Sequence, residues 1–306
     1  MTRYRIALIP GDGIGAEVLP PAEALLDAVG RRHGIEFAYD SCDWSCERYL
    51  AEGAMVPDDG LDRIRHHDAV LLGAVGWPGV PDHVSPWGLL IPIRRTFQQY
   101  VNLRPVKALA GVPSPLRSAG AGGVDLVVVR GNVEGEYSEI GGRLGRGTAD
   151  ELAVQEAVIT RKGVTRVVEY AYAVAGSIGV APAADLDPER EFPSMFEPVH
   201  GSAPDIAGRG EADPLGAIWS AAMMLDHLGH PDASAELLAA AFGALADGVS
   251  AADLGGTADT AGYTRAVPTG WAPRPAWAHE RRSRTFGHWS PPPTGAAAGV
   301  RPGRHG

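Results

Sequence analysis

The hydrophobic pattern near the amino terminus predicts a strand followed by a helix. Ile6, Leu8 and Ile9 form a short apolar run, and apolar residues over 25–29 recur at the spacing of one helical face. Between them, "IPGDGIGAE" has the glycine content of a turn. Gly11, Gly13 and the next glycine give GxGxG, not the GxGxxG of a dinucleotide fingerprint, so a tight strand-to-helix turn is the better interpretation.

Later segments repeat this organisation. Residues 68–78, "DAVLLGAVGWP", predict a buried strand that ends in glycines, and residues 124–142, "VDLVVVRGNVEGEYSEIGG", predict a third strand that runs into a polar loop. Residues 213–229, "DPLGAIWSAAMMLDHLG", predict a helix that ends at Gly229. Strands that alternate with helices and end in glycine turns predict an α/β sheet with ligands bound at the strand ends.

Residues 166–182, "RVVEYAYAVAGSIGVAP", join two patterns with no turn between them. Apolar side chains recur at helical spacing up to Ala175, which predicts a helix that faces the core. The following "GSIGVAP" is typical of a glycine-punctuated loop beside a ligand. The passage of such a helix directly into such a loop needs a physical explanation.

The composition of the 306-residue chain is globular, with 45% hydrophobic and 21% charged residues. No apolar run approaches the roughly 20 residues that span a bilayer, and the amino terminus does not have the pattern of a signal peptide. We therefore expect a cytoplasmic protein that has no membrane partner. Cys42 and Cys46 have no further ligands at zinc spacing and are expected to be reduced thiols.

The net charge of −10 is unevenly distributed. Residues 268–306 contain six Arg and one Glu, a charge of +5, which leaves −15 on residues 1–267. So acidic a body argues against nucleic acid as a partner. Residues 268–306 also contain seven Pro and six Gly without an apolar period, so we expect a disordered tail after a body that ends at 267.

Three arginines and one tyrosine are candidates for substrate chemistry. Arg94 and Arg104 lie in "IRRTFQQYVNLRP", and Arg130 ends the third predicted strand. Guanidinium groups that face one cleft can bind a substrate with two carboxylates, although each arginine could equally be a solvated surface charge. Tyr137 lies in a glycine-flanked polar loop, where it is either a general acid or an ordinary loop tyrosine.

The segment 195–214, "MFEPVHGSAPDIAGRGEADP", has the polar composition of a binding loop. Its backbone N–H groups and Asp205 suit an adenosine ribose, and His200 could stack on a base. The pair His66 and His67, by contrast, is expected on a solvated helix face.

Seven motifs follow one another along residues 4–267: "IPGDGIG", "GAVGWP", "NLRP", "EGEYS", "GSIGVAP", "FEPVHGSAPDIAG" and "DLGGTADT". Together they resemble the metal-dependent β-decarboxylating dehydrogenases, the family of isopropylmalate and isocitrate dehydrogenases. "GAVGWPGVPDHVSPWG", "QQYVNLRPV" and "LDPEREFPSMFEP" are most similar to its tartrate dehydrogenase/decarboxylase and D-malate dehydrogenase branch. The resemblance implies the isopropylmalate dehydrogenase-like α/β fold, a mixed sheet flanked by helices.

The resemblance also implies a chemistry. Members of the family use NAD(P) with Mn²⁺ or Mg²⁺ to oxidise and decarboxylate a small 2-hydroxy dicarboxylic acid, such as tartrate or D-malate, and they form homodimers. By motif, Arg94, Arg104 and Arg130 resemble the carboxylate clamps and Tyr137 the proton donor. The cofactor-binding residues implied by the resemblance are His200, Gly201, Ser202, Ala203, Pro204, Asp205, Ile206, Ala212 and Asp213.

One dipeptide refines what the resemblance implies, and two positions depart from the family pattern. NAD-dependent members carry Asp-Ile where NADP-dependent members carry Lys-Tyr, and this chain has Asp205 followed by Ile206, which favours NAD. The branch usually has Asn at the position of Asp213, and a carboxylate cannot donate the hydrogen bond that an amide donates to adenine. It also usually has Glu at the position of Gly131.

The family pattern continues for several dozen residues between "VVEYAYA" and "GSIG", and this chain lacks that block. In the family, the block carries the catalytic Lys, the metal-binding Asp residues, central strands and the arm that clasps the second subunit. We therefore expect segments 1–173 and 174–267 joined across a deletion, no metal ligands, a dimer interface without its arm, and exposed sheet edges. The deletion is either real or an error in the gene sequence. The alternative function is an inactive remnant that at most binds nucleotide or a partner.

Overall fold

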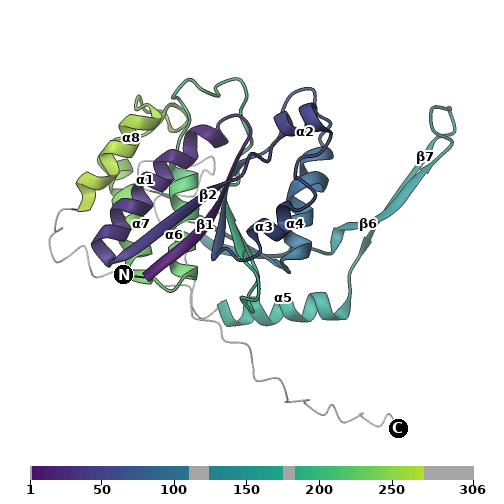
Figure 1. The fold of residues 1–306 in the computed structure, drawn as a ribbon, viewed down its shortest axis with the longest axis horizontal. Coiled ribbons are helices and arrows are strands. Elements are labelled where there is room, and N and C mark those ends of the chain that lie inside the picture. The colour runs from purple at the N-terminus through teal and green to yellow at the C-terminus, as the bar shows by residue number, and fades with distance from the viewer. Residues whose placement is uncertain (1, 110–123, 175–182, 272–306) are drawn as a thin grey trace, which may run out of the picture.

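A seven-stranded mixed sheet forms the centre of the molecule (Figure 1). The computed structural model describes residues 2–109, 124–174 and 183–271. Neighbouring strands pair in parallel from the β2 edge as far as β9 and antiparallel from there to the β5 edge, so the predicted mixed α/β fold is confirmed. Across the sheet the order is β2 (Ile35–Ser41), β1 (Thr2–Gly11), β3 (Ala69–Ala74), β9 (Ser194–Glu197), β8 (Ala183–Leu186), β4 (Val101–Lys107) and β5 (Asp125–Gly131).

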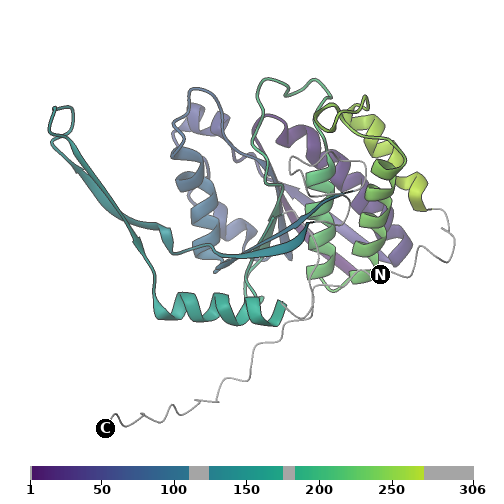
Figure 2. The same cartoon turned by 180° about the vertical axis from the view of Figure 1, so that it is seen from behind.

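Helices cover both faces of this sheet (Figure 2). The larger apolar cluster lies under α1 (Gly15–His33), α6 (Leu215–His227), α7 (Pro231–Ala246) and α8 (Thr260–Ala266). The smaller one lies under α2 (Cys46–Glu52), α3 (Gly60–Ile64), the π-helical turn Pro86–Leu90 and α4 (Ile91–Thr96). The second cluster includes Trp44 and Phe97, both nearly inaccessible to solvent, so each layer has a core of its own.

The sheet is continuous at the point where the sequence predicts a deletion. β8 and β9 follow the predicted junction, and both strands are buried along their whole length between β3 and β4. The exposed apolar surface lies at the β5 edge, where Leu126 is 46% and Val128 is 44% exposed. The expectation of an exposed edge thus applies to β5, whereas the middle of the sheet is closed.

The helix before the junction differs from its prediction. α5 (Arg161–Val174) forms as expected, but Val164, Val168 and Tyr172 of the predicted core face are exposed. Only the side of the helix with Val167 and Tyr170 packs inward. α5 lies along the edge strand β5 and has the sheet on one side only, which leaves its second apolar stripe in solvent.

A two-stranded hairpin projects from the body beside α5 (Figure 1). It consists of β6 (Gly135–Leu144) and β7 (Leu152–Val158), paired antiparallel. The arm that clasps a second subunit was expected inside the missing block. The chain nevertheless contains a projecting hairpin ahead of the predicted junction, directly after Glu134.

The glycine turn after β1 has the tight geometry that its sequence predicts. Gly11 and Gly13 adopt φ values of 69° and 57°, which favour glycine. A Cβ on Gly13 would lie 2.0 Å from the carbonyl oxygen of Ser202, so the turn also permits close approach of a distant loop. The buried carboxylate of Asp12 accepts hydrogen bonds from the backbone N–H groups of Cys46 and Gly76, which ties β1, β3 and α2 together.

Some predicted features lie outside the described residues or at their boundary. "GSIGVAP", residues 176–182, and the tail from 272 to 306 lie outside them. The packed body continues past the expected boundary at 267, because a 3₁₀ helix at Val267–Trp271 packs against α7 and Trp271 is partly buried. In the described ranges no helix is long and apolar enough to cross a membrane. Cys42 and Cys46 are free thiols.

Candidate functional site

A cavity of about 800 Å³ opens where β1 and β9 end. It lies at the carboxyl ends of parallel strands, which is where ligands bind in sheets of this kind. Six of the nine candidate cofactor residues line it, namely His200, Gly201, Ala203, Ile206, Ala212 and Asp213. The other three, Ser202, Pro204 and Asp205, are not part of its lining.

The loop after β9 is held in place by the start of α1. The carbonyl oxygen of Ser202 accepts a hydrogen bond from Ile14 N–H at 2.8 Å, and Ser202 Oγ bonds the carbonyl of Gly76. Further along, Glu17 accepts hydrogen bonds from the backbone N–H groups of Gly208 and Ala212 at 3.0 and 2.9 Å. A single carboxylate in the first turn of α1 thus fixes the far half of the loop.

The imidazole of His200 lies over the amino-terminal turn of α6. Its Nδ1 is 3.0 Å from the carbonyl oxygen of Gly201, and a Cβ on Gly216 would lie 3.3 Å from its Cδ2. The glycine at 216 therefore makes room for the ring. Nε2 of His200 is buried and has no partner among the described residues. The ring is thus positioned at the cavity wall with one polar atom available to a ligand.

Three carboxylates line the same cavity and no lysine or arginine does, as far as the described residues extend. They belong to Glu211, Asp213 and Asp253. Asp213 Oδ1 accepts a hydrogen bond from Leu215 N–H at 2.8 Å. Burial, and to a smaller degree Asp253, raises the pKa of Asp213 to about 6. The cavity is electronegative.

Two of these acidic groups, Glu211 and Asp253, were not predicted from the sequence, whereas Asp205 was. Asp205 is exposed and lies outside the lining. Asp253 belongs to the quoted motif "DLGGTADT", so its motif could have identified it as a site residue. Glu17 had no sequence signal beyond its place in the first turn of a helix.

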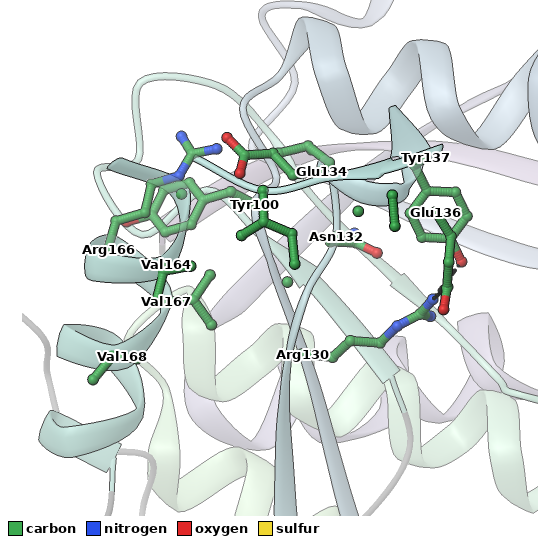
Figure 3. Close-up of a pocket in the computed structure, with 16 residues that line it drawn as sticks. Tyr100, Arg130, Asn132, Glu134, Glu136, Tyr137, Val164, Arg166, Val167 and Val168 are labelled. Carbon is green, nitrogen blue, oxygen red and sulfur yellow. Dashed lines mark hydrogen bonds and ion pairs between the residues drawn. The ribbon is translucent and has the colours of Figure 1, made fainter. Parts of the chain in front are cut away.

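A second cavity, of about 350 Å³, lies between β5, the base of the hairpin and α5 (Figure 3). Arg130 and Tyr137 meet on one side of it, and Tyr100 and Arg166 lie on the other (Figure 3). An N–H of Arg130 donates to the Tyr137 hydroxyl at 2.6 Å. The same guanidinium lies 5.0 Å from the centre of the Tyr137 ring and is 3.4 Å from Glu136. The structure thus brings together two of the four candidate substrate residues.

The other two candidates belong to a neighbouring buried network. The side chain of Arg94 is 7% exposed and pairs with Asp185 at 3.3 Å and Glu197 at 2.7 Å. Asp185 also accepts hydrogen bonds from the side-chain amides of Asn102 and Asn132, at 2.6 and 2.8 Å. Arg104, on β4, donates to Asn102 Oδ1.

The network pairs one terminal nitrogen of Arg94 with internal carboxylates, whereas its Nε is buried and has no partner among the described residues. Burial and, to a smaller degree, repulsion from Asp185 raise the pKa of Glu197 to about 8, although the Arg94 guanidinium opposes this shift. Two protein carboxylates thus compete with any substrate for the Arg94 guanidinium. Arg130 lines the second cavity directly.

Neither a metal site nor a catalytic lysine is found in the part of the chain that the structure describes. No group of three or more His, Cys, Asp or Glu side chains there could hold a metal ion. Outside it, the segments 110–123 and 175–182 contain none of these residue types, whereas residues 272–306 contain three His and one Glu. The chain has two lysines, Lys107 and Lys162, and both are exposed and line neither cavity.

Comparison with protein families gives one match. The profile of isocitrate/isopropylmalate dehydrogenases matches residues 5–176 and, as a second segment, 171–267. The chain is 38% identical over 345 residues to the tartrate dehydrogenase/decarboxylase of Pseudomonas putida, an alignment that covers 84% of this chain and 94% of the relative. It is 39% identical over 347 residues to the D-malate dehydrogenase (decarboxylating) of Escherichia coli K12, with 85% and 96% covered.

Among solved structures, the isocitrate dehydrogenase of Methylococcus capsulatus aligns with a TM-score of 0.73 at 24% identity. The alignment covers 88% of this chain and 99% of that one. At this level of identity the likeness concerns the fold.

Proposed function

Because the chain belongs to the isocitrate/isopropylmalate dehydrogenase family, we propose that its function is the NAD-dependent oxidation and decarboxylation of a small 2-hydroxy dicarboxylic acid such as tartrate or D-malate. The relatives named above, with identities of 38% and 39%, support this substrate class. The observation that carries the cofactor half of the proposal is the cavity at the carboxyl ends of β1 and β9.

The cavity suits an adenosine with a free ribose diol. His200 offers a ring face for the adenine, and the carboxylate of Glu211 can accept hydrogen bonds from the ribose hydroxyls. A 2′-phosphate would meet three carboxylates without a compensating cation. NAD(H) should therefore bind more tightly than NADP(H). Bound NAD would supply the hydride acceptor, and the residues of this chain hold it.

The second cavity supports the substrate half. Arg130 is placed to receive one carboxylate of a 2-hydroxy dicarboxylic acid, and Tyr137 to deliver a proton through its hydroxyl. The hydrogen bond between them orients the phenol and stabilises its oxygen when the proton leaves. The residues that the structure describes do not fit the divalent metal of the family, so no step is assigned to a metal here.

A second candidate function is an inactive remnant that binds nucleotide. The alignment with the D-malate dehydrogenase spans 347 positions, whereas 85% of 306 residues is about 260, so about 87 positions of the relative have no counterpart here. The two profile segments overlap at 171–176, next to the junction between α5 and β8. Two exposed lysines and no acidic metal site in the described residues favour lost catalysis with retained nucleotide binding.

The hairpin supports a homodimer. Side chains of β6 and β7 alternate, and their pairing places four exposed apolar residues on one face, namely Ile140, Leu144, Leu152 and Val154. An apolar face on a projecting hairpin is stabilised by cover from a second copy. We expect a dimer by analytical ultracentrifugation. Leu144→Glu should give a monomer with unchanged circular dichroism, and a monomeric unaltered chain would contradict the proposal.

Fluorescence titration of the full chain with NADH and NADPH tests the cofactor assignment. The proposal predicts saturable NADH binding at least about tenfold tighter than NADPH binding, a difference of 1.4 kcal/mol. Equal or tighter binding of NADPH would contradict the cofactor assignment.

A further inference from the structure

A third cavity, of about 420 Å³, lies at the other end of the sheet. Its walls include residues 65–68, which precede β3, and residues 190–193, which precede β9. Both segments lie at the amino ends of parallel strands, whereas the candidate cofactor cavity lies at carboxyl ends. Helix α6 has Gly216 at the cofactor cavity and His227 at this one, so the two cavities are separate sites.

His67 lines this cavity in a way that its sequence did not predict. α3 ends at Ile64, so His67 is not on a solvated helix face, and its side chain is only 3% exposed. Nε2 lies 2.7 Å from Asp40 Oδ2, and a ring nitrogen beside a carboxylate is the donor. Nδ1 is buried and has no partner among the described residues. Leaving such an atom unpaired is unfavourable, so a ligand that bonds it stabilises the site.

Two arginines face the same cavity from different loops. The guanidinium of Arg65 lies 5.5 Å from the centre of the Phe192 ring and 5.8 Å from that of Phe97, and it pairs with Asp62 at 3.1 Å. These contacts hold Arg65 in one place. Arg190 adopts a φ of 59°, where an L side chain is strained and glycine would be relaxed. Retaining an arginine there maintains a cation at the cavity at the expense of backbone strain.

We propose that this cavity binds a phosphate group. Arg65 and Arg190 supply guanidinium donors, which match phosphate oxygens in geometry and charge. A hydrogenphosphate can donate its O–H to the neutral Nδ1 of His67 and can equally accept from the protonated ring. Two carboxylates also line the cavity, but Asp68 already accepts the Arg5 backbone N–H at 2.7 Å, and Glu191 lies on the exposed rim.

Other ligand classes fit less well. No set of three or more potential metal ligands exists in the described residues, which argues against a cation here. His227 adds no charge, because burial, followed by the charge of Arg190, lowers its pKa to about 3. The cavity volume is that of a small-molecule site, so the phosphate is free or carried by a small organic molecule.

Calorimetric titration of the full chain with inorganic phosphate, in chloride buffer of constant ionic strength, tests the proposal. We expect saturable binding at one site per chain. Arg190→Gly removes the cation and relaxes the backbone, so it should weaken binding at least tenfold without lowering the melting temperature. Arg63→Gln is the matched control, because Arg63 is exposed on α3 and pairs with Asp59 outside the cavity. It should stay within twofold of the unaltered chain.

Three results would overturn the proposal. The first is no saturable binding at millimolar phosphate. The second is equal weakening by Arg190→Gly and Arg63→Gln, which would indicate attraction to the general surface charge. The third is displacement of phosphate by NAD⁺, which would assign the anion to the cofactor cavity.

Discussion

Two buried carboxylates share one guanidinium beside the candidate substrate cavity. Glu197 and Asp185 both pair with Arg94, and the charge of the trio is −1 when both acids are ionised. In so dry a setting an uncompensated charge is costly, and a proton on Glu197 removes it. The raised pKa of Glu197 therefore makes the free energy of unfolding depend on pH.

The pH dependence of unfolding tests this network. The folded-state pKa of Glu197 lies above its unfolded value, so its stabilisation is full below pH 4.5 and is lost as the pH rises towards 8. We expect the free energy of unfolding in urea to fall between pH 5 and 8 by more in the unaltered chain than in Glu197→Gln. The control Glu36→Gln removes an acid that is 53% exposed and should keep the unaltered slope. Parallel slopes for all three proteins would contradict the assignment.

Two aspartate variants test whether residues that line the cavity, rather than residues near it, control cofactor binding. Asp213→Asn keeps an acceptor for Leu215 N–H, adds an amide donor and removes a carboxylate from the lining. NADH binding should tighten by about threefold to tenfold, and NADPH binding by more, because repulsion of the 2′-phosphate falls. Asp205→Asn, outside the lining, should change either affinity by less than twofold, as measured by fluorescence titration. The reverse order would show that Asp205 faces the ribose.

Site residues that lie in one continuous motif were predicted from the sequence, whereas contacts between residues far apart in the sequence were not. His200 and Asp213 lie in one uninterrupted motif, so a single loop brings them to the cavity. The partners of Arg94 lie 91 and 103 residues away, and no local pattern links them to it. Arg94 therefore looked like a free clamp. His67 looked solvated because helical periodicity was extended past Ile64, the end of α3.

At the scale of elements, β5 is an open edge strand that exposes apolar side chains. Val127 and Val129 pack against the core, whereas Leu126 and Val128 point outward and Val106 of β4 pairs with Leu126. An apolar face beside an open strand edge promotes association. The strand and the helix 161–174 were predicted by pattern, but the hairpin was not, because a polar loop was expected after the strand. Their exposure was not predicted, because burial depends on which neighbours the sheet acquires.

Lysine substitutions on the two faces of β5 test this description. Leu126→Lys with Val128→Lys should raise solubility and change the free energy of unfolding by less than about 0.5 kcal/mol, as is usual for surface positions. Val127→Lys places the same charge against the core and should cost about 2 kcal/mol or more. Solubility and urea denaturation of both variants provide the measurement. Similar effects on the two faces would contradict the assigned orientation of the strand.

At the scale of the whole molecule, a continuous sheet coexists with the lack of a metal site in the residues that the structure describes. Four-residue strands β8 and β9 are enough to connect the parallel and antiparallel halves of the sheet. Such closure keeps the cofactor loop at the end of β9, and Glu17 fastens it. Among the described residues, the closed sheet assembles no metal site and puts no lysine at either candidate cavity, because both require particular side chains.

The central claim is that the chain keeps the cofactor site and substrate class proposed above but, with neither a base nor a metal site found among the described residues, turns over its substrate slowly. Its most direct test is NADH formation by the full chain with D-malate or tartrate, NAD⁺ and Mn²⁺, beside the D-malate dehydrogenase of Escherichia coli K12. A positioned base alone contributes about 10²–10⁴-fold, so we predict a rate at least about 100-fold below that of the relative, with NADH still bound in titration. Metal-dependent turnover within about tenfold of the relative, a barrier difference of only about 1.4 kcal/mol, would contradict the claim.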